Sequence, residues 1–111
     1  MRRMARLFRA VKANPPTEHD FRSPWDLGRR PRKNRPMQVR LYQGVSTYET
    51  LEMMIAKATE AELGDFVAEL EVPDEVGRNG NGRGHVDLEG TTPSQLLKYV
   101  VQIHAIESGE R

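Results

Sequence analysis

A proline-rich stretch removes almost a quarter of this 111-residue chain from regular secondary structure. Residues 13–37 contain five prolines and no apolar periodicity, so they predict a long loop or arm. A loop of this length is far above the roughly 4–6 residues that usually join elements in a small domain, and long loops are often functional. A single domain over residues 1–111 must therefore build its core from residues 5–12 and 38–106, followed by a tail at 107–111.

The rest of the chain alternates between strand and helix patterns. Five segments carry apolar side chains at roughly every second position and predict strands: residues 5–12, 38–46, 65–72, 85–89 and 100–106. Apolar residues at helical spacing predict a helix over residues 50–63, with Gly64 as its stop: Leu51, Met54, Ile55 and Ala58. A second, short helix starts at Thr92, because Pro93 and Gln95 complete a capping box. The glycine-rich run 77–84 predicts a flexible loop.

These elements predict an α+β domain with a small mixed or antiparallel sheet of about five strands and two helices. The chain has no cysteine, which excludes disulfides and thiol catalysis, and no apolar run long enough to cross a bilayer. Its N-terminus has arginines but lacks the apolar core of a secretory signal. We therefore expect a cytoplasmic protein, with secretion by a signal-independent route left open, and no membrane partner.

Charge is divided unevenly along the chain. Residues 1–40 hold 12 Lys and Arg against 3 Asp and Glu, whereas residues 41–111 hold 5 against 13. The basic arm at 29–35 is the densest positive segment, and it has an aromatic neighbour in Trp25. Its cations are Arg29, Arg30, Arg32, Lys33 and Arg35. Such an arm suits nucleic acid through phosphate contacts and stacking, an acidic protein partner, or the chain's own acidic half. A solvated arm without a partner is the simpler interpretation.

Three groups of polar residues are candidates for a site. Arg9 lies between Leu7 and Val11 on one face of the first strand, where a buried guanidinium needs an anionic partner. A bound phosphate or a structural glutamate, Glu69 or Glu71, would serve. The segment 43–50 joins a strand to a helix start, whose hydroxyls and free N–H groups suit phosphate or ribose, although simple capping is the commoner explanation. His85, Asp87 and Glu89 share one strand face. No spacing typical of a metal site is present, so no metal is predicted.

The order of these motifs resembles the small bacterial ADP-ribosyltransferase-like proteins, such as type VI secretion toxins that use NAD and rifampin ADP-ribosyltransferases. The likeness rests on a first strand bearing Arg9, on the segment Gly44-Val45-Ser46-Thr47-Tyr48 running into the helix of Glu49-Thr50-Leu51-Glu52, and on the closing VVQIHAI of residues 100–106.

The resemblance implies an NAD-consuming toxin with NAD bound in a cleft between the first strand and residues 43–50. It implies that Arg9 anchors the pyrophosphate and that the nicotinamide pocket draws on four further residues: Tyr42, Ser46, Thr47 and Tyr48. Glu89 or His85 would take the catalytic position, where a carboxylate stabilises the positive charge that develops on the ribose. An antitoxin or immunity protein is the implied partner. The alternatives are a noncatalytic module that binds nucleic acid or an acidic protein through the arm 29–35, and one half of a tight protein pair.

Overall fold

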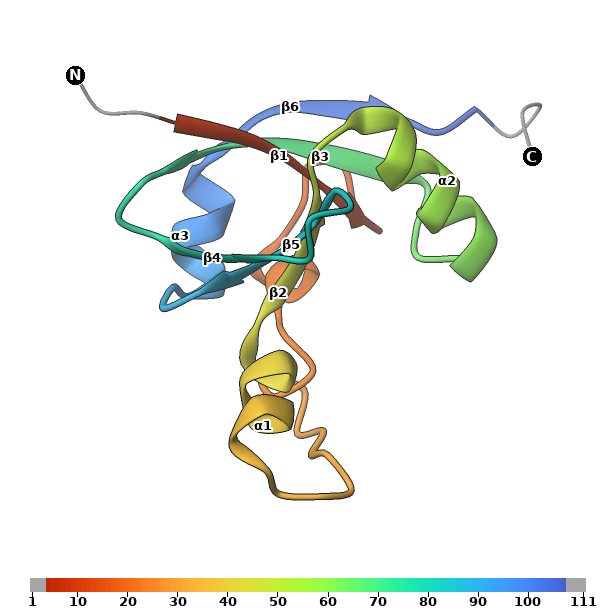
Figure 1. Ribbon diagram of the computed structural model, residues 1–111. Coiled ribbons are helices and arrows are strands. Elements are labelled where there is room, and N and C mark those ends of the chain that lie inside the picture. The colour runs from red at the N-terminus through yellow and green to blue at the C-terminus, as the bar shows by residue number, and fades with distance from the viewer. Residues whose placement is uncertain (1–3, 108–111) are drawn as a thin grey trace.

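The computed structural model describes residues 4–107 and contains one antiparallel sheet with the strand order β4-β5-β2-β1-β3-β6 (Figure 1). Its strands are β1 Met4–Val11, β2 Val45–Tyr48, β3 Phe66–Pro73, β4 Gly77–Gly80, β5 His85–Glu89 and β6 Val100–Ala105. The helices are α1 Pro36–Gln43, α2 Leu51–Ala61, α3 Pro93–Lys98 and a 3-10 helix, η1, at Glu18–Phe21. The predicted α+β class is confirmed, with six strands instead of about five and three α-helices instead of two. Residues 108–111 of the predicted tail lie outside the described residues.

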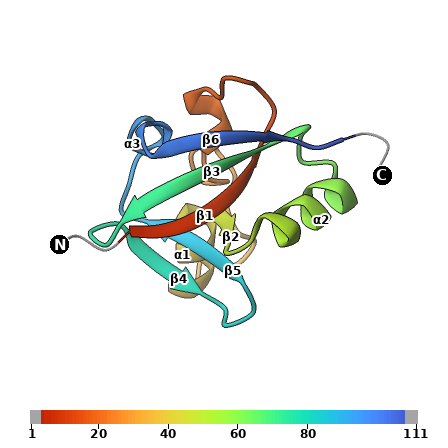
Figure 2. The ribbon, with the colours of Figure 1, turned by 90° about the horizontal axis from the view of Figure 1, so that it is seen from above.

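Apolar side chains pack on both faces of the sheet. On one face, Leu7 and Val11 of β1 join a core that includes Phe21 of η1 and Leu96 of α3. On the other, Phe8 packs with residues of α2, β3 and the segment after β6: Met54, Ala58, Val67 and Ile106. This confirms the predicted alternation along β1. Figure 2 looks down on the sheet, with β6, β3 and β1 nearest the viewer and α1 behind them.

The two predicted helix starts are confirmed by their caps. Thr50 accepts a hydrogen bond from the backbone N–H of Met53, and Thr92 forms a capping box with Gln95. The stop of α2 differs from the prediction, because Glu62, and not Gly64, adopts the left-handed conformation at φ 53°.

The strand predicted at residues 38–46 is wrong over most of its length, because residues 36–43 form α1 and β2 begins only at Val45. Pro36 occupies the first turn of α1, where its fixed φ and missing N–H favour a helix start. Half-buried Val39 and Tyr42 follow the i, i+3 spacing of a helix, which the alternation of Val39 and Leu41 had concealed.

The flexible loop predicted at residues 77–84 is also wrong in its first half. Residues 77–80 form β4, which pairs with β5 through backbone hydrogen bonds that need no side chains. The following turn is organised by Asn81, whose side-chain oxygen accepts the backbone N–H groups of Arg83 and His85.

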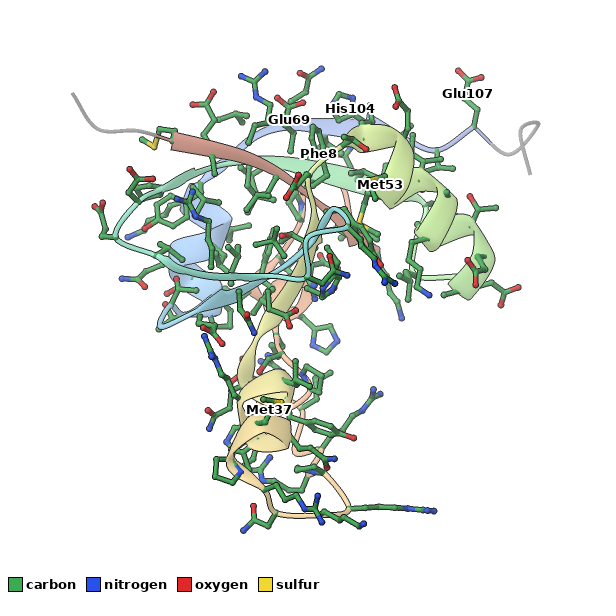
Figure 3. The ribbon with its side chains drawn as sticks, in the orientation of Figure 1. Phe8, Met37, Met53, Glu69, His104 and Glu107 are labelled. Atoms are coloured by element: carbon green, nitrogen blue, oxygen red, sulfur yellow. The ribbon has the colours of Figure 1, made fainter. Side chains whose placement is uncertain are left out.

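The predicted arm 13–37 is partly a folded part of the domain. Phe21 is fully buried in the core, and the backbone N–H of Trp25 donates to the carbonyl of Tyr42 at 2.9 Å. From Pro24 onward the chain leaves the sheet and returns through α1. Residues 24–43, which we term the projection, extend to one side of the sheet, with exposed Met37 on α1 (Figure 3).

Candidate functional site

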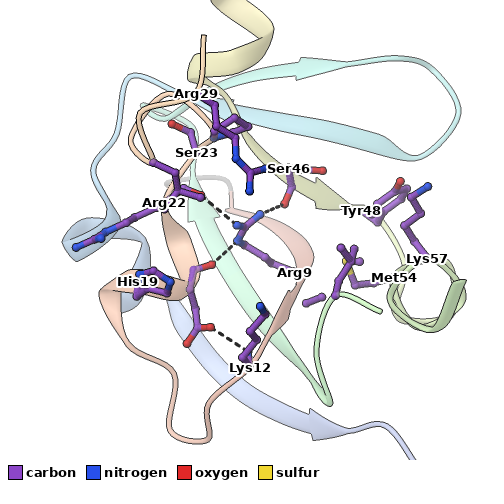
Figure 4. A pocket seen from close by; sticks show the side chains of 15 residues that line it. Arg9, Lys12, His19, Arg22, Ser23, Arg29, Ser46, Tyr48, Met54 and Lys57 are labelled. Atoms are coloured by element: carbon purple, nitrogen blue, oxygen red, sulfur yellow. Dashed lines mark hydrogen bonds between the residues drawn. The ribbon is translucent and has the colours of Figure 1, made fainter. Parts of the chain in front are cut away.

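A pocket of about 430 Å³ opens where β1 and β2 face the segment 19–29 and α2. Arg9 lies at its centre, and Figure 4 shows its guanidinium between the loop bearing Arg29 and the side chain of Lys12. Ser46 and Tyr48 of β2 also line the pocket. The volume falls within the range of about 300–1,000 Å³ that small-molecule sites usually have.

The guanidinium of Arg9 is held by three backbone carbonyls. Its Nε donates to Asp20 O at 2.7 Å, its Nη1 to Ser46 O at 2.7 Å and its Nη2 to Arg22 O at 3.4 Å. These bonds join β1 to β2, to η1 and to the residue that follows η1. Burial lowers the pKa of Arg9 to about 10, and the nearby charges of Asp20 and Asp87 oppose that shift. At neutral pH the side chain is therefore still a cation.

Of the two anions expected beside Arg9, the structural glutamate is wrong. Glu69 and Glu71 point to the opposite face of the sheet, where Arg6 pairs with both at 3.2 and 3.0 Å. Glu69 also contacts His104 at 2.8 Å, as seen above the sheet in Figure 3. None of the ion pairs found within residues 4–107 includes Arg9. Neutral carbonyls provide its hydrogen-bond acceptors, and no carboxylate of the described residues pairs with it directly.

Further cations surround the same pocket. Lys12, Arg29 and Lys57 line it, and within the described part of the chain none of the three forms an ion pair. Asp20 is the acidic residue in the lining, but its carboxylate accepts the backbone N–H groups of Lys12 and Thr17. The pocket therefore has a positive potential that suits an anion.

The pocket also has an apolar end. Tyr48, Met54 and Leu63 line it together with Lys57. Figure 4 places Tyr48, Met54 and Lys57 on the side of Arg9 that lies away from Arg22 and His19. An elongated ligand with an anionic part and a ring or other apolar part matches this division.

Polar side chains of β2 and β5 continue the Ser46 wall. Ser46 Oγ lies 2.7 Å from His85 Nε2, and the rings of Tyr48 and His85 meet edge to face with centroids 5.1 Å apart. Asp87 Oδ1 is 3.5 Å from the same His85 nitrogen, so one ring nitrogen faces both groups and a Ser-His-Asp relay is not assembled. Burial raises the pKa of Asp87, and the absence of a side chain at Gly44 leaves room for its carboxylate.

The structure brings together only some of the residues predicted for an NAD site. Arg9, Ser46 and Tyr48 line the pocket, and His85 adjoins it through Ser46. Thr47 is fully buried on the other face of β2, where its hydroxyl donates to the Val86 carbonyl.

Tyr42 and Glu89 lie apart from this pocket. Tyr42 belongs to α1, and neither residue is in the pocket lining. Both Glu89 carboxylate oxygens accept hydrogen bonds from Arg40 at 2.7 and 2.8 Å. This pair holds the pKa of Glu89 below its ordinary value.

The cations of the arm 29–35 have separate environments. Arg29 lines the pocket, and Arg30 lies 3.7 Å above the centre of the Trp25 ring. Arg32, Lys33 and Arg35 are exposed. Sequence reasoning missed the pocket roles of Lys12, Lys57, His19 and Asp20, which come from segments distant in the chain.

No protein-family model, curated protein or solved structure matches this chain. Residues 4–107 contain no group of three or more His, Asp or Glu side chains placed to hold a metal ion. Within the same range, no helix has the length and apolar character needed to cross a membrane.

Proposed function

We propose that the pocket beside Arg9 binds a phosphate-bearing nucleotide, with NAD as the ligand favoured by the resemblance to ADP-ribosyltransferases. The observation that carries this proposal is a buried guanidinium with carbonyl partners but no ion pair to a described carboxylate. Three of its five N–H groups are used, so two remain for a ligand. A phosphate would supply both acceptors and the missing negative charge.

The lining residues suggest an orientation for the ligand. Phosphates would lie beside Arg9, Lys12 and Arg29, where charge-assisted hydrogen bonds are available. A base or nicotinamide ring would lie at the apolar end, against Tyr48 and Met54. The main-chain and side-chain groups of Ser46 then stand between the two parts.

The geometry supports binding more directly than turnover. Cleavage of a ribosyl bond develops positive charge that a carboxylate would stabilise, but Glu89 is held by Arg40 outside the lining. His85 is the predicted catalytic residue nearest the pocket, through its contact with Ser46. ADP-ribosyl transfer, a toxin role and an immunity or antitoxin partner therefore stay predictions from the resemblance.

Titration calorimetry with NAD, ADP-ribose and adenosine tests the proposal. Binding of NAD and ADP-ribose but not adenosine is expected, because adenosine has no phosphate. The double variant Lys12→Ala/Arg29→Ala should weaken ADP-ribose binding by at least about 100-fold, since each of the two lost charge-assisted hydrogen bonds contributes about 1.5–3 kcal/mol.

The matched control is Arg32→Ala/Lys33→Ala, which removes the same charge from exposed positions outside the lining. It should leave the affinity unchanged. If neither NAD nor ADP-ribose at millimolar concentration gives binding heat or a shift in melting temperature, the proposal is wrong. Equal weakening by the two double variants would also contradict it, since that result indicates nonspecific charge attraction.

A further inference from the structure

The projection, residues 24–43, carries two exposed apolar side chains on α1 and a dense set of cations in its sequence. Residues 27–43 include six Arg and Lys and no Asp or Glu. Met37 and Leu41 are 75% and 49% exposed, and their i, i+4 spacing places them on one face of α1. No residue of α1 is buried. An apolar ridge of this kind gains stability only if another surface covers it.

A second surface of the same chain has complementary properties. A groove of about 500 Å³ runs along α2, lined by apolar Ile55, Ala56 and Ile106. The exposed Glu52 and Glu60 also line it, eight residues apart on the helix, which corresponds to about 12 Å. It therefore combines an apolar surface with carboxylates, whereas the projection combines an apolar ridge with cations.

A chain cannot place its projection in its own groove. Both ends of the projection are fixed, because Ser23 and Val45 on either side of it are buried in the domain. Figure 1 shows α1 extending from the sheet in a direction away from α2. The matching surface is therefore available only on another molecule.

We propose that the projection docks in the α2 groove of a second copy of this chain. Each copy offers one projection and one groove, so a reciprocal exchange uses both contacts and closes the assembly as a symmetric pair. The contact brings Arg32 and Lys33 toward Glu52 and Glu60. The charged side chains of this contact differ from those of the nucleotide pocket, because neither Arg32 nor Lys33 lines that pocket.

Nucleic acid fits the projection less well. Apolar Met37 and Leu41 make no favourable contact with phosphates. A base would also need an exposed aromatic ring to stack on, and Trp25 is partly covered. Arg30 already lies 3.7 Å from the centre of the Trp25 ring and covers one of its faces. The apolar ridge thus favours a protein surface.

Light scattering after size-exclusion chromatography of the full chain tests the proposal over a range of concentrations and salt. The mass should rise with concentration toward twice the 12.7 kDa of one chain, and less so at high salt. Arg32→Glu/Lys33→Glu and Glu52→Lys/Glu60→Lys should each raise the dissociation constant by at least about tenfold. Met37→Gln/Leu41→Gln should weaken association as well.

An equimolar mixture of the two charge-reversed variants provides the decisive comparison. In the mixed pair both contacts again join opposite charges, so the mixture should associate more tightly than either variant alone. Arg83→Glu and Glu18→Lys reverse exposed charges elsewhere and should have no effect. Circular dichroism of every variant checks that it is folded.

Three results would overturn the proposal. A monomeric mass at all concentrations excludes a second copy as the occupant, and association that survives both charge reversals places the contact elsewhere. A monomer that binds a labelled oligonucleotide, and loses that binding in Arg32→Glu/Lys33→Glu, would make the projection a nucleic-acid surface instead.

Discussion

Replacement of Arg9 by methionine should destabilise the domain strongly even without a ligand. Methionine keeps an apolar stem in the interior but removes the guanidinium. The carbonyls of Asp20 and Ser46 would each lose a 2.7 Å hydrogen bond, and the Arg22 carbonyl would lose a longer one. Because these carbonyls belong to β2, to η1 and to the residue after η1, the variant loses contacts that join distant parts of the chain.

The expected loss follows from the two short bonds. A hydrogen bond from a charged donor contributes about 1.5–3 kcal/mol, so the pair contributes about 3–6 kcal/mol. Burial disfavours the charge, as the lowering of the Arg9 pKa to about 10 indicates, so the lower value applies. A loss of about 3 kcal/mol corresponds to about 13 °C in melting temperature for a chain of 111 residues.

Thermal unfolding followed by circular dichroism measures this loss. Arg6→Met is the matched control, since the Arg6 side chain lies on the same strand but is 60% exposed, and its buried partner Glu69 keeps a contact with His104. Exposed ion pairs contribute about 0–1 kcal/mol, so the control should shift the melting temperature by at most about 4 °C. An Arg9→Met variant that melts within that range would refute the structural role of the three carbonyl bonds.

Three further predictions concern other parts of the fold. Burial raises the pKa of Asp87 above 3.8, so the free energy of unfolding falls as pH rises through the pKa of the folded state. Asp87→Asn should remove that fall from melting temperatures measured above about pH 4. An unchanged pH profile in this variant would contradict the prediction. Gly64→Ala, at φ +149°, places a Cβ against the Val11 carbonyl of β1 and should lower the free energy of unfolding in denaturant by about 3 kcal/mol. Gly28→Ala, at φ +81° with nothing within 4 Å of the added Cβ, is the control and should lower it by about 1 kcal/mol. Equal losses would argue against a steric overlap at Gly64. Arg30→Ala uncovers one face of Trp25, the chain's single tryptophan, so acrylamide should quench its fluorescence more strongly, and identical quenching would show that the stacking is absent in solution.

The elements that sequence predicted well are those specified by local rules. Thr50 and Thr92 begin helices because their hydroxyls accept backbone N–H groups within the same turn. The alternation around Arg9 predicted which face of β1 it occupies, because successive side chains of a strand point to opposite sides.

The elements that sequence predicted badly depend on partners outside their own segment. The glycines of β4 offer no side-chain pattern, and the strand exists because β5 provides its backbone partners. In α1, a short apolar pattern fits both the helical and the strand period, and no residue of α1 is buried in a way that distinguishes them. Pro36 was the available local signal for the helix.

The Arg9 site also depends on partners outside its own segment, which the sequence could not identify. A buried Arg9 was predicted to need an anion, either a bound phosphate or the carboxylate of Glu69 or Glu71. In the structure, the backbone carbonyls of residues 20, 22 and 46 accept the hydrogen bonds of Arg9. Every residue type has such a carbonyl, and only the folded topology brings these three together. Because carbonyls satisfy hydrogen bonds without neutralising charge, Arg9 keeps its positive charge at the centre of a pocket where Lys12, Arg29 and Lys57 add more. The structural glutamate expected beside Arg9 is therefore wrong, and the other expected anion, a bound phosphate, stays a prediction.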